Sequence, residues 1–422
     1  MSATSSVTWP NRVDEIDLSD VSFWERPQDE RLAAFAMLRR ERPIAFFEEP
    51  EVPGLPVGPG YHAVTRHADV VEMSIRPDVF CSSKGATSVP DLPEEMLTFY
   101  GSMINMDNPR HARLRRIVQA AFTPRMIGQI YDDVARLAKR IVAEAVPKGE
   151  FDLVAEIAAP FPLIVICDMM GIPESERDFV LAETNVILSG GDPEFMPEGV
   201  EPIGRLLQAG MDLAGLMTKI AEDRVANPTD DLTSALVNTA VDGEKLTHAE
   251  LASFFILLVA AGNETTRTAT THGVYELFRN PDQQRIWMND RSVTDSAVEE
   301  IVRYASPVIF MRRTVTRDVE VGGHQFHEGD KVTLQYNAAN RDETVFTDPD
   351  RFDVRRDPNP HLGFGARGPH FCLGAHLARR EMAVIFNEMF DQMPNLTVTG
   401  EPAHLRSGFI NGIKRLPVSV GG

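Results

Sequence analysis

The stretch "HLGFGARGPHFCLGAHLARRE", residues 361–381, decides the fold, and it carries two competing signals. Residues 363–368 spell G-x-G-x-x-G, the pattern of a dinucleotide-binding turn, and Cys372 follows four residues later. The dinucleotide pattern requires a buried strand before it and a helix directly after it. Here the preceding "VRRDPNPHL" is charged and interrupted by proline, and Pro369 follows the last glycine. We therefore expect the chemistry at Cys372.

Cys372 has the surroundings of a reactive or metal-binding thiol. A thiolate is the form that binds metal, and glycines at a helix N-terminus lower the pKa of a thiol and direct backbone N–H groups at its sulfur. A buried structural cysteine remains the alternative. Cys81 in "VFCSS" and Cys167 in "VICDMM" are typical of small buried apolar residues. Three cysteines are too few for a disulfide framework or for an iron–sulfur cluster.

Length and composition set outer bounds on the class of protein. The 422 residues contain no linker, repeat or low-complexity tract, so we expect one domain over 1–422, with a poorly ordered segment over 1–20. A net charge of −20 argues against nucleic acid as a general partner. The polar N-terminus lacks a signal peptide, and the apolar stretch 251–262 is shorter than the roughly 20 residues that span a bilayer. We expect a cytoplasmic monomer.

Periodicity predicts a mainly α chain with small β-sheets. Most of 100–305 has helical spacing, including a helix with Asn108 as N-cap and Pro109 at its first position. Between 308 and 337, short β-branched runs surround glycine pairs and predict an antiparallel sheet. The C-terminal segments "LTVTG" and "KRLPVSV" predict a second small sheet, and a helix is expected to resume near Gly374.

The cysteine loop resembles the haem-binding signature of the cytochrome P450 superfamily, F-G-x-G-x-H-x-C-x-G. The resemblance implies the P450 fold, with Cys372 as axial ligand and metal ligand of haem b. It also implies that residues around Cys372 contact the cofactor: Phe364, Gly365, His370 and Gly374. Phe364 lies eight residues before the cysteine instead of the commoner seven, so either Gly365 or Gly368 fills the usual glycine position. A loop of this length resembles bacterial members that oxidise steroids and branched lipids.

Two further elements match the family. "EIVR" places Glu300 and Arg303 three residues apart on one helix, which alone is a common surface pair worth about 0.2–0.5 kcal/mol. With Arg356 in "PDRFDVRR", the pair resembles the family's structural Glu-x-x-Arg network. The resemblance also implies donors to the haem propionates, which need charged partners when buried. These are His111, Arg115, Arg313 and His370. Without the resemblance, "RHARLRR" would be a solvated basic helix face.

"LVAAGNETTRT", residues 258–268, interrupts an apolar helix with Gly262, at a cost of about 1 kcal/mol relative to alanine. The hydroxyl of Thr265 can bond the carbonyl of Ala261 and open the helix locally. The stretch resembles the family's A-G-x-(D/E)-T groove, which places Ala261 at the cofactor and makes Glu264 and Thr265 the catalytic acid and alcohol. A solvated kink at a helix end is the alternative.

The resemblance implies a monooxygenase that inserts one atom of O2 into a C–H bond, since thiolate ligation favours O–O cleavage. The chain has no segment for a flavin or iron–sulfur domain, so electrons would come from NAD(P)H through a separate ferredoxin and its reductase. A basic patch on this acidic protein could attract the ferredoxin, although a solvated face is the alternative. Its members are Arg110, Arg113, Arg116, Arg367, Arg379 and Arg380.

Two other functions stay open at this point: a peroxide-driven peroxygenase and a haem-thiolate gas-binding protein without turnover. The acid–alcohol pair argues against both. By family analogy, substrate contacts are expected at apolar or weakly polar positions, namely Thr87, Val89, Val259, Ile309, Phe310 and Phe409. No charged residue is an obvious anchor, so we expect a hydrophobic terpenoid, steroid or branched lipid rather than a polar macrolide.

Overall fold

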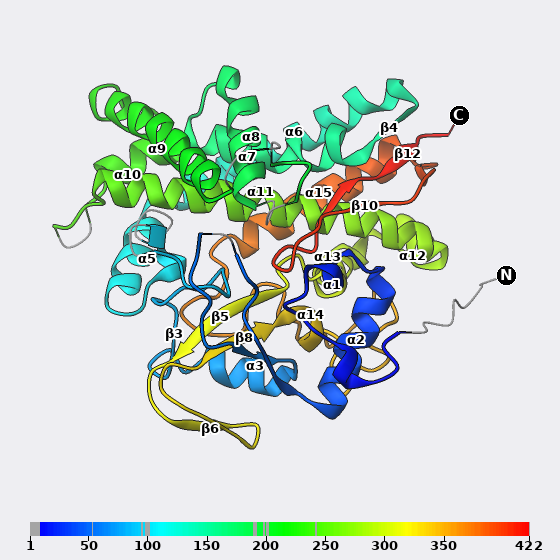
Figure 1. Cartoon of the computed structure of the whole chain (residues 1–422). Coiled ribbons are helices and arrows are strands. Elements are labelled where there is room, and N and C mark those ends of the chain that lie inside the picture. Colours follow the sequence, from blue (N-terminus) through cyan, green and yellow to red (C-terminus); the bar gives the residue numbers. More distant parts are fainter. Residues whose placement is uncertain are drawn as a thin grey trace.

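The computed structural model describes residues 9–52, 54–93, 96–97, 102–188, 192–196, 199, 202–240 and 243–421. Figure 1 shows a helical part in the upper half of the view and a part built around a small sheet in the lower half. The prediction of a mainly α chain with small sheets is confirmed. The helices up to residue 240 are α1 (Val21–Glu25), α2 (Gln28–Glu41), α3 (His67–Ser74), α5 (Arg110–Ala121), α6 (Pro124–Ala145), α7 (Pro160–Met170), α8 (Arg177–Leu188), α9 (Pro202–Ala226) and α10 (Leu232–Asn238).

Helix α11 is the axis of the helical part. It runs for 32 residues and begins with a capping box, in which Thr247 and Glu250 satisfy each other's backbone N–H groups. It packs against α7, α8 and α9 on one side and against later helices on the other (Figure 1). Helix α11 spans His248–Arg279, and the later helices that it contacts are α12 (Pro281–Asn289), α13 (Thr294–Ala305) and α15 (Ala375–Gln392). The short helix α14 (Tyr336–Ala339) precedes the cysteine loop. Shorter helical turns are η1 (Val13–Glu15), η2 (Met103–Asn105), η3 (Val146–Lys148), η4 (Val154–Ala158), η5 (Glu174–Glu176) and η6 (Arg291–Val293).

The largest sheet has five strands in the order β1-β2-β8-β5-β3. Strands β2 and β8 pair in parallel although about 270 residues separate them, and the other pairs are antiparallel. The hairpin β6–β7 turns at Gly322 and Gly323, whose φ angles of 59° and 78° are the left-handed values that glycine favours. The strands are β1 (Ile44–Phe47), β2 (Tyr61–Val64), β3 (Phe80–Cys81), β5 (Phe310–Val315), β6 (Val319–Val321), β7 (His324–Phe326) and β8 (Lys331–Gln335).

The predicted C-terminal sheet forms with one strand that the sequence did not reveal. Segments β9 (Thr397–Val398) and β12 (Pro417–Ser419) pair as expected, and β4 (Glu150–Asp152) adds to the other edge of β12. Three residues are too few to show an alternating pattern. A further two-stranded pair joins β10 (Ala403–His404) to β11 (Ile413–Arg415).

The expectation of poor order over 1–20 stays a prediction. Residues 1–8 lie outside the described part, and within 9–20 the side chains of Ile16 and Leu18 are buried in a cluster with α2. The predicted N-cap at Asn108 is also wrong. Pro109 occupies the cap position of α5, where its own backbone is already helical, and no side chain caps the helix. No helix of the described chain has the length and apolarity needed to cross a bilayer.

Candidate active site

A backbone hydrogen bond between Phe364, the first residue of the signature, and Cys372 closes the cysteine loop. The N–H of Cys372 donates to the carbonyl of Phe364 at 3.0 Å, so the extra residue lies inside this closed loop. Gly365 turns the chain at a φ of 80°, and its N–H donates to Leu362 O at 2.8 Å. Gly368 has a different constraint, since a Cβ there would lie 2.6 Å from the carbonyl oxygen of Ser74 in α3. The two glycines therefore serve a turn and a close approach, respectively.

Cys372 differs from the other two cysteines in its exposure. Cys81 and Cys167 are buried as predicted, whereas the side chain of Cys372 is accessible. Desolvation by the surrounding protein raises the pKa of its thiol. The backbone N–H of Gly374, just before α15, and the charge of Arg115 oppose that shift by favouring the thiolate.

Basic side chains lie around the cysteine loop. The rings of His111 in α5 and His370 in the cysteine loop lie 4.3 Å apart between centroids. Burial lowers the pKa of both imidazoles, that of His370 to about 3, and leaves His370 Nε2 without a hydrogen-bond partner. Arg115 was predicted to meet a propionate, but its Nη1 and Nη2 donate to the carbonyls of Pro369 and Phe371 at 2.9 and 2.8 Å. Arg115 therefore holds the cysteine loop directly.

Arg313, on β5, is a buried cation without a counter-ion. Its side chain is 5% exposed, and its hydrogen bond is to a neutral carbonyl, Arg312 O at 2.7 Å. No carboxylate of the described chain pairs with it, and burial lowers its pKa. An unpaired buried charge is costly and calls for an anionic partner. Arg313, the imidazoles of His111 and His370 and the accessible thiol fit haem, which brings a metal for the sulfur and carboxylates for the guanidinium and imidazole donors.

Helix α11 presents one open face toward solvent-accessible space. Thr265 Oγ1 donates to Ala261 O at 2.6 Å, the bond expected from the sequence, and both residues are accessible. Close packing explains why position 262 is a glycine, since a Cβ there would approach Ile166 Cδ1 of α7 to 2.7 Å. The predicted contact Val259 does not share this face, because it is 0% exposed in the core. Leu258, about two turns before Thr265, is partly exposed instead.

Glu264, next to Thr265 in the sequence, points into the protein. Its side chain is 1% exposed and forms an ion pair with Arg267, and Thr268 Oγ1 approaches it at 3.5 Å. Burial raises the pKa of this carboxyl, and the charge of Arg267 opposes the shift. Arg267 in turn donates to Asn185 Oδ1 of α8 at 3.0 Å. The acid is thus held by α8 and α11, away from the face that carries Thr265.

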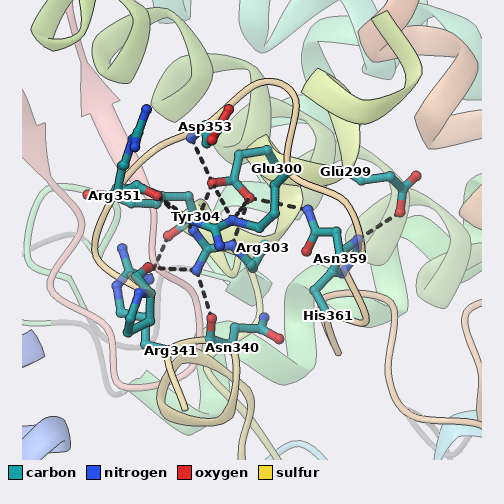
Figure 2. Close-up of polar contacts among 12 residues, drawn as sticks. Glu299, Glu300, Arg303, Tyr304, Asn340, Arg341, Arg351, Asp353, Asn359 and His361 are labelled. Carbon is teal, nitrogen blue, oxygen red and sulfur yellow. Dashed lines mark hydrogen bonds and ion pairs between the residues drawn. The ribbon is translucent and has the colours of Figure 1, made fainter. Parts of the chain in front are cut away.

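The predicted structural network is assembled around Glu300 (Figure 2). Arg303 donates to its two carboxylate oxygens at 2.7 and 2.8 Å, and Arg356 Nε lies 3.1 Å from both. Arg303 also donates to Asn340 O at 2.9 Å, while the side chain of Asn340 accepts from Leu362 N at 2.6 Å. The network therefore reaches the start of the cysteine loop through Asn340.

Comparison with known proteins now places this site in a family. Residues 79–392 match the sequence model described as Cytochrome P450. The chain belongs to the cytochrome P450 family. It is 50% identical over 409 residues to a methyl-branched lipid omega-hydroxylase of Mycobacterium tuberculosis, covering 96% of this chain and 94% of the relative. It is 40% identical over 419 residues to a steroid C26-monooxygenase of Mycolicibacterium smegmatis, covering 98% and 95%.

A solved structure confirms the P450 fold. A Mycobacterium marinum cytochrome P450 in complex with pseudoionone matches with a TM-score of 0.90 at 39% identity, covering 97% of this chain and 100% of that one. The chain is a cytochrome P450 monooxygenase. Membership of the family implies a haem-thiolate cofactor, in agreement with the donor set around Cys372.

Sequence reasoning missed one buried acid of this P450. Glu381 ends the quoted stretch and follows two arginines. In the structure it is 3% exposed, and Thr266 Oγ1 donates to its Oε2 at 3.1 Å. Burial raises its pKa to about 8. Its spacing from Ala378 and Ile385 places Glu381 on the apolar stripe of α15, and this spacing was the available signal.

The predicted basic patch of the P450 is partly neutralised. Arg113 donates to Glu244 at 2.6 Å and to Glu250 at 2.8 Å, and Arg379 is paired with Glu299. These arginines therefore contribute less free charge than expected. Exposed members of the patch without an ion pair in the described residues are Arg110, Arg367 and Arg380. Arg116 is also exposed.

Three of the predicted substrate contacts meet at one corner. The rings of Phe310 and Phe409 lie 5.6 Å apart between centroids, and Ile309 N donates to Phe409 O at 2.8 Å. Neighbouring residues of an extended segment face opposite sides, and here Ile309 is buried and lines a separate small cavity. Phe310 and Phe409 are therefore better candidates than Ile309.

The remaining predicted contacts, Thr87 and Val89, belong to a partly buried loop that is tied to the sheet. Arg312 donates to Val89 O at 3.0 Å and to Asp91 Oδ1 at 2.6 Å. Lys331, buried beside it, lies 2.9 Å from Asp91 Oδ2. Two buried cations thus clamp the loop through Asp91.

Proposed function

We propose that this P450 hydroxylates the terminal carbon of a methyl-branched aliphatic substrate, such as a branched lipid, a steroid side chain or an acyclic terpenoid. The 50% identity with the methyl-branched lipid omega-hydroxylase supports this choice most directly. "Omega" and "C26" both denote the end of an aliphatic chain, so the two named relatives suggest one type of target. The aromatic corner of Phe310 and Phe409 and the partly exposed Leu258 suit a narrow apolar chain end.

The cofactor would be held by Cys372 at its metal and by Arg313, His111 and His370 at its carboxylates. When bound, haem supplies the oxidising chemistry. The chain's contribution to proton delivery begins at Thr265, whose hydroxyl proton is engaged by Ala261 O. The hydroxyl oxygen therefore keeps its acceptor capacity and can orient a water on the open face of α11.

Glu264 would be the proton source in this proposal. Burial raises its pKa and so favours the protonated acid, and Arg267 holds the carboxyl in the core. Breaking the contact with Arg267 would let the carboxyl turn toward the face of Thr265. In this relay Glu264 would supply the proton and Thr265 would orient the water that carries it, so the two side chains need not be in direct contact.

Electrons would come from NAD(P)H through a separate ferredoxin and its reductase. The exposed arginines Arg110, Arg367 and Arg380 on an otherwise acidic chain support docking of an acidic donor beside the cysteine loop. A peroxygenase would instead turn over with hydrogen peroxide alone, so peroxide-driven product formation is measured alongside.

The test is turnover of the haem-loaded enzyme with a ferredoxin and reductase on three substrates. These are a methyl-branched fatty acid, its linear counterpart of equal length and a steroid with a branched side chain. We expect products hydroxylated at the chain terminus, identified by mass spectrometry, with the branched acid preferred over the linear one. Oxidation at internal carbons only, or equal turnover of the linear acid, would contradict the proposal.

Thr265→Ala tests the proposed alcohol. We expect the variant to consume NADPH but release hydrogen peroxide at the expense of product, because the water on the face of α11 loses its acceptor. Thr218→Ala is the matched control, since Thr218 makes the same bond to the carbonyl four residues back, Ala214 O at 2.8 Å, on α9. Unchanged coupling in Thr265→Ala would remove the hydroxyl from the mechanism.

A further inference from the structure

A small cavity lies behind the segment that leads to Phe409. It measures about 20 Å³ and is lined by α1 and α2 on one side and by the end of α13 and the region of α14 on the other. The proposed haem ligands and propionate donors do not line it. The lining residues used below are Arg31, Tyr304, Ile309, Arg341 and Asn411.

Arg31, on α2, is a buried cation at this cavity with no partner in the described chain. Its side chain is 6% exposed, and its guanidinium makes no hydrogen bond or ion pair with a described residue. The Nε atom is completely enclosed and unsatisfied. Burial lowers the pKa of Arg31 only to about 10, so the charge persists at neutral pH. A desolvated guanidinium of this kind destabilises a fold unless an anion accompanies it.

A second guanidinium, that of Arg341, lines the same cavity and can be followed in Figure 2. Its Nη1 donates to Tyr304 O at 3.0 Å, and its plane lies 4.2 Å over the ring of Tyr304. Its Nε is 3.4 Å from a carboxylate oxygen of Asp350, whose side chain is 75% exposed. The buried Nη2 has no partner. Arg341 thus also has a free donor at the cavity.

The other ionisable groups near these arginines are two imidazoles and two acids, and of the acids Glu276 acts electrostatically on Arg341. His272 and His404 interact with the charge of Arg31, and burial lowers their pKa values to about 3 and about 4, so both are neutral. The carboxyl of Glu276 is buried against Arg279, and burial raises its pKa. Asp29 acts on Glu276 as a further acid of this region. Neither acid pairs with Arg31.

We propose that this cavity binds one monatomic anion of the size of chloride, held between Arg31 and Arg341. A water-sized particle needs about 10–15 Å³ of such space, so about 20 Å³ admits one small particle and excludes a tetrahedral oxyanion of five heavy atoms. Two guanidinium groups supply charge-assisted donors from two different elements. The anion would connect α2 to the chain after α14.

The site has a structural link to the segment that carries Phe409. Asn411 lines the cavity, its N–H donates to Pro307 O at 2.9 Å, and its Nδ2 donates to Ala305 O at 2.7 Å. His272 Nε2 lies 2.7 Å from Asn411 O, which makes this carbonyl the acceptor of a neutral imidazole. Ile309 joins Phe409 by its backbone and lines the cavity with its side chain. A bound anion would therefore stiffen the back of the aromatic corner.

Crystals of the haem-loaded wild-type protein grown in sodium bromide provide the direct test. We expect an anomalous peak for bromide within hydrogen-bonding distance of both Arg31 and Arg341. An ordered water at this place without an anomalous peak overturns the proposal and makes the cavity a water site. A peak only at the protein surface overturns it equally.

Thermal unfolding tests the site in solution. At constant ionic strength, replacing sodium gluconate by sodium chloride should raise the wild-type Tm in a saturable way, because only the folded state binds the ion. Arg31→Met should lose this response, whereas Arg40→Met, an exposed position on the same helix, should keep it. In gluconate, Arg31→Met should be at least as stable as the wild type, since it removes an unpaired buried charge. An equal chloride response in both variants contradicts the proposal.

Discussion

Replacing Glu381 by glutamine should remove a large part of the pH dependence of stability. The side chain is buried, has no cationic partner in the described chain, and accepts a hydrogen bond from Thr266 Oγ1 at 3.1 Å. Burial raises its pKa to about 8 from the 4.5 of the exposed carboxyl. The folded state therefore binds this proton more tightly than the unfolded state does. Glutamine keeps the shape and the acceptor for Thr266 but cannot ionise.

The sign and size of the effect follow from this shift. The stabilisation by the protonated carboxyl is complete below pH 4.5 and is lost as the pH rises toward about 8. At about 1.36 kcal/mol per pH unit, the 3.5 units between 4.5 and about 8 amount to about 5 kcal/mol. Between pH 5 and pH 8, the free energy of unfolding should thus shift in favour of Glu381→Gln by about 4 kcal/mol.

The assay is unfolding in urea followed by circular dichroism, with wild type and variant compared at each pH. The comparison is necessary because Glu264 and Glu276 are also buried acids with raised pKa values and add to the wild-type slope. Glu388→Gln, on the outer side of the same helix, serves as the control substitution. A difference between wild type and Glu381→Gln that stays constant from pH 5 to pH 8 would refute the reasoning, since it would mean that the folded protein ionises Glu381 freely.

Three further predictions concern the haem site and the electron donor. Cys372→Ser should lose the thiolate-type Soret band of the reduced carbonyl complex, while Cys81→Ser, in a buried position, should keep it; a retained band in the first variant would end the assignment. Arg313→Met should speed haem transfer to apomyoglobin about ten- to a hundredfold, because it removes a charge-assisted hydrogen bond worth about 1.5–3 kcal/mol; an unchanged rate would show that the propionates bind elsewhere. Arg367→Glu should slow reduction by a ferredoxin in stopped-flow measurements and weaken its salt dependence, whereas Arg113→Glu should have the smaller effect, because Arg113 is already paired with two glutamates. Equal slowing by both variants would place the docking surface differently.

Local patterns predicted the parts of the fold that depend on neighbouring residues. Helix α15, the end of α13 before Pro307 and the Gly322–Gly323 turn were all expected from spacing and turn chemistry. The bond from Thr265 to Ala261 was also expected, since both groups belong to one helical turn. The pairing of β2 with β8 could not be predicted in this way, because the strands are short and far apart in the chain.

The side-chain directions at the site that local patterns could not predict have the same origin. The side chains of neighbouring helical residues differ by about 100° in direction. The sequence alone does not fix how α11 is rotated about its axis, so it could not show that Leu258 rather than Val259 is on the open face. The direction of Arg115 depends on carbonyls of a loop more than 250 residues away. Likewise, the three-residue spacing of Glu264 and Arg267 could have predicted their ion pair on one helix. It could not have predicted that the pair is buried.

The clamp on Asp91 has a consequence for how this enzyme could acquire new substrates. Arg312 and Lys331 share that carboxylate, so exchanging Asp91 would leave the buried Arg312 without an ion pair in the described chain and Lys331 with Glu49 alone. The exchange would cost stability before it changed selectivity. Thr87 lies on the same loop but outside the clamp, and Phe409 lies on the C-terminal segment. Natural drift and laboratory evolution should therefore accumulate changes at Thr87 and Phe409, while Asp91, Arg312 and Lys331 persist together as one inherited unit.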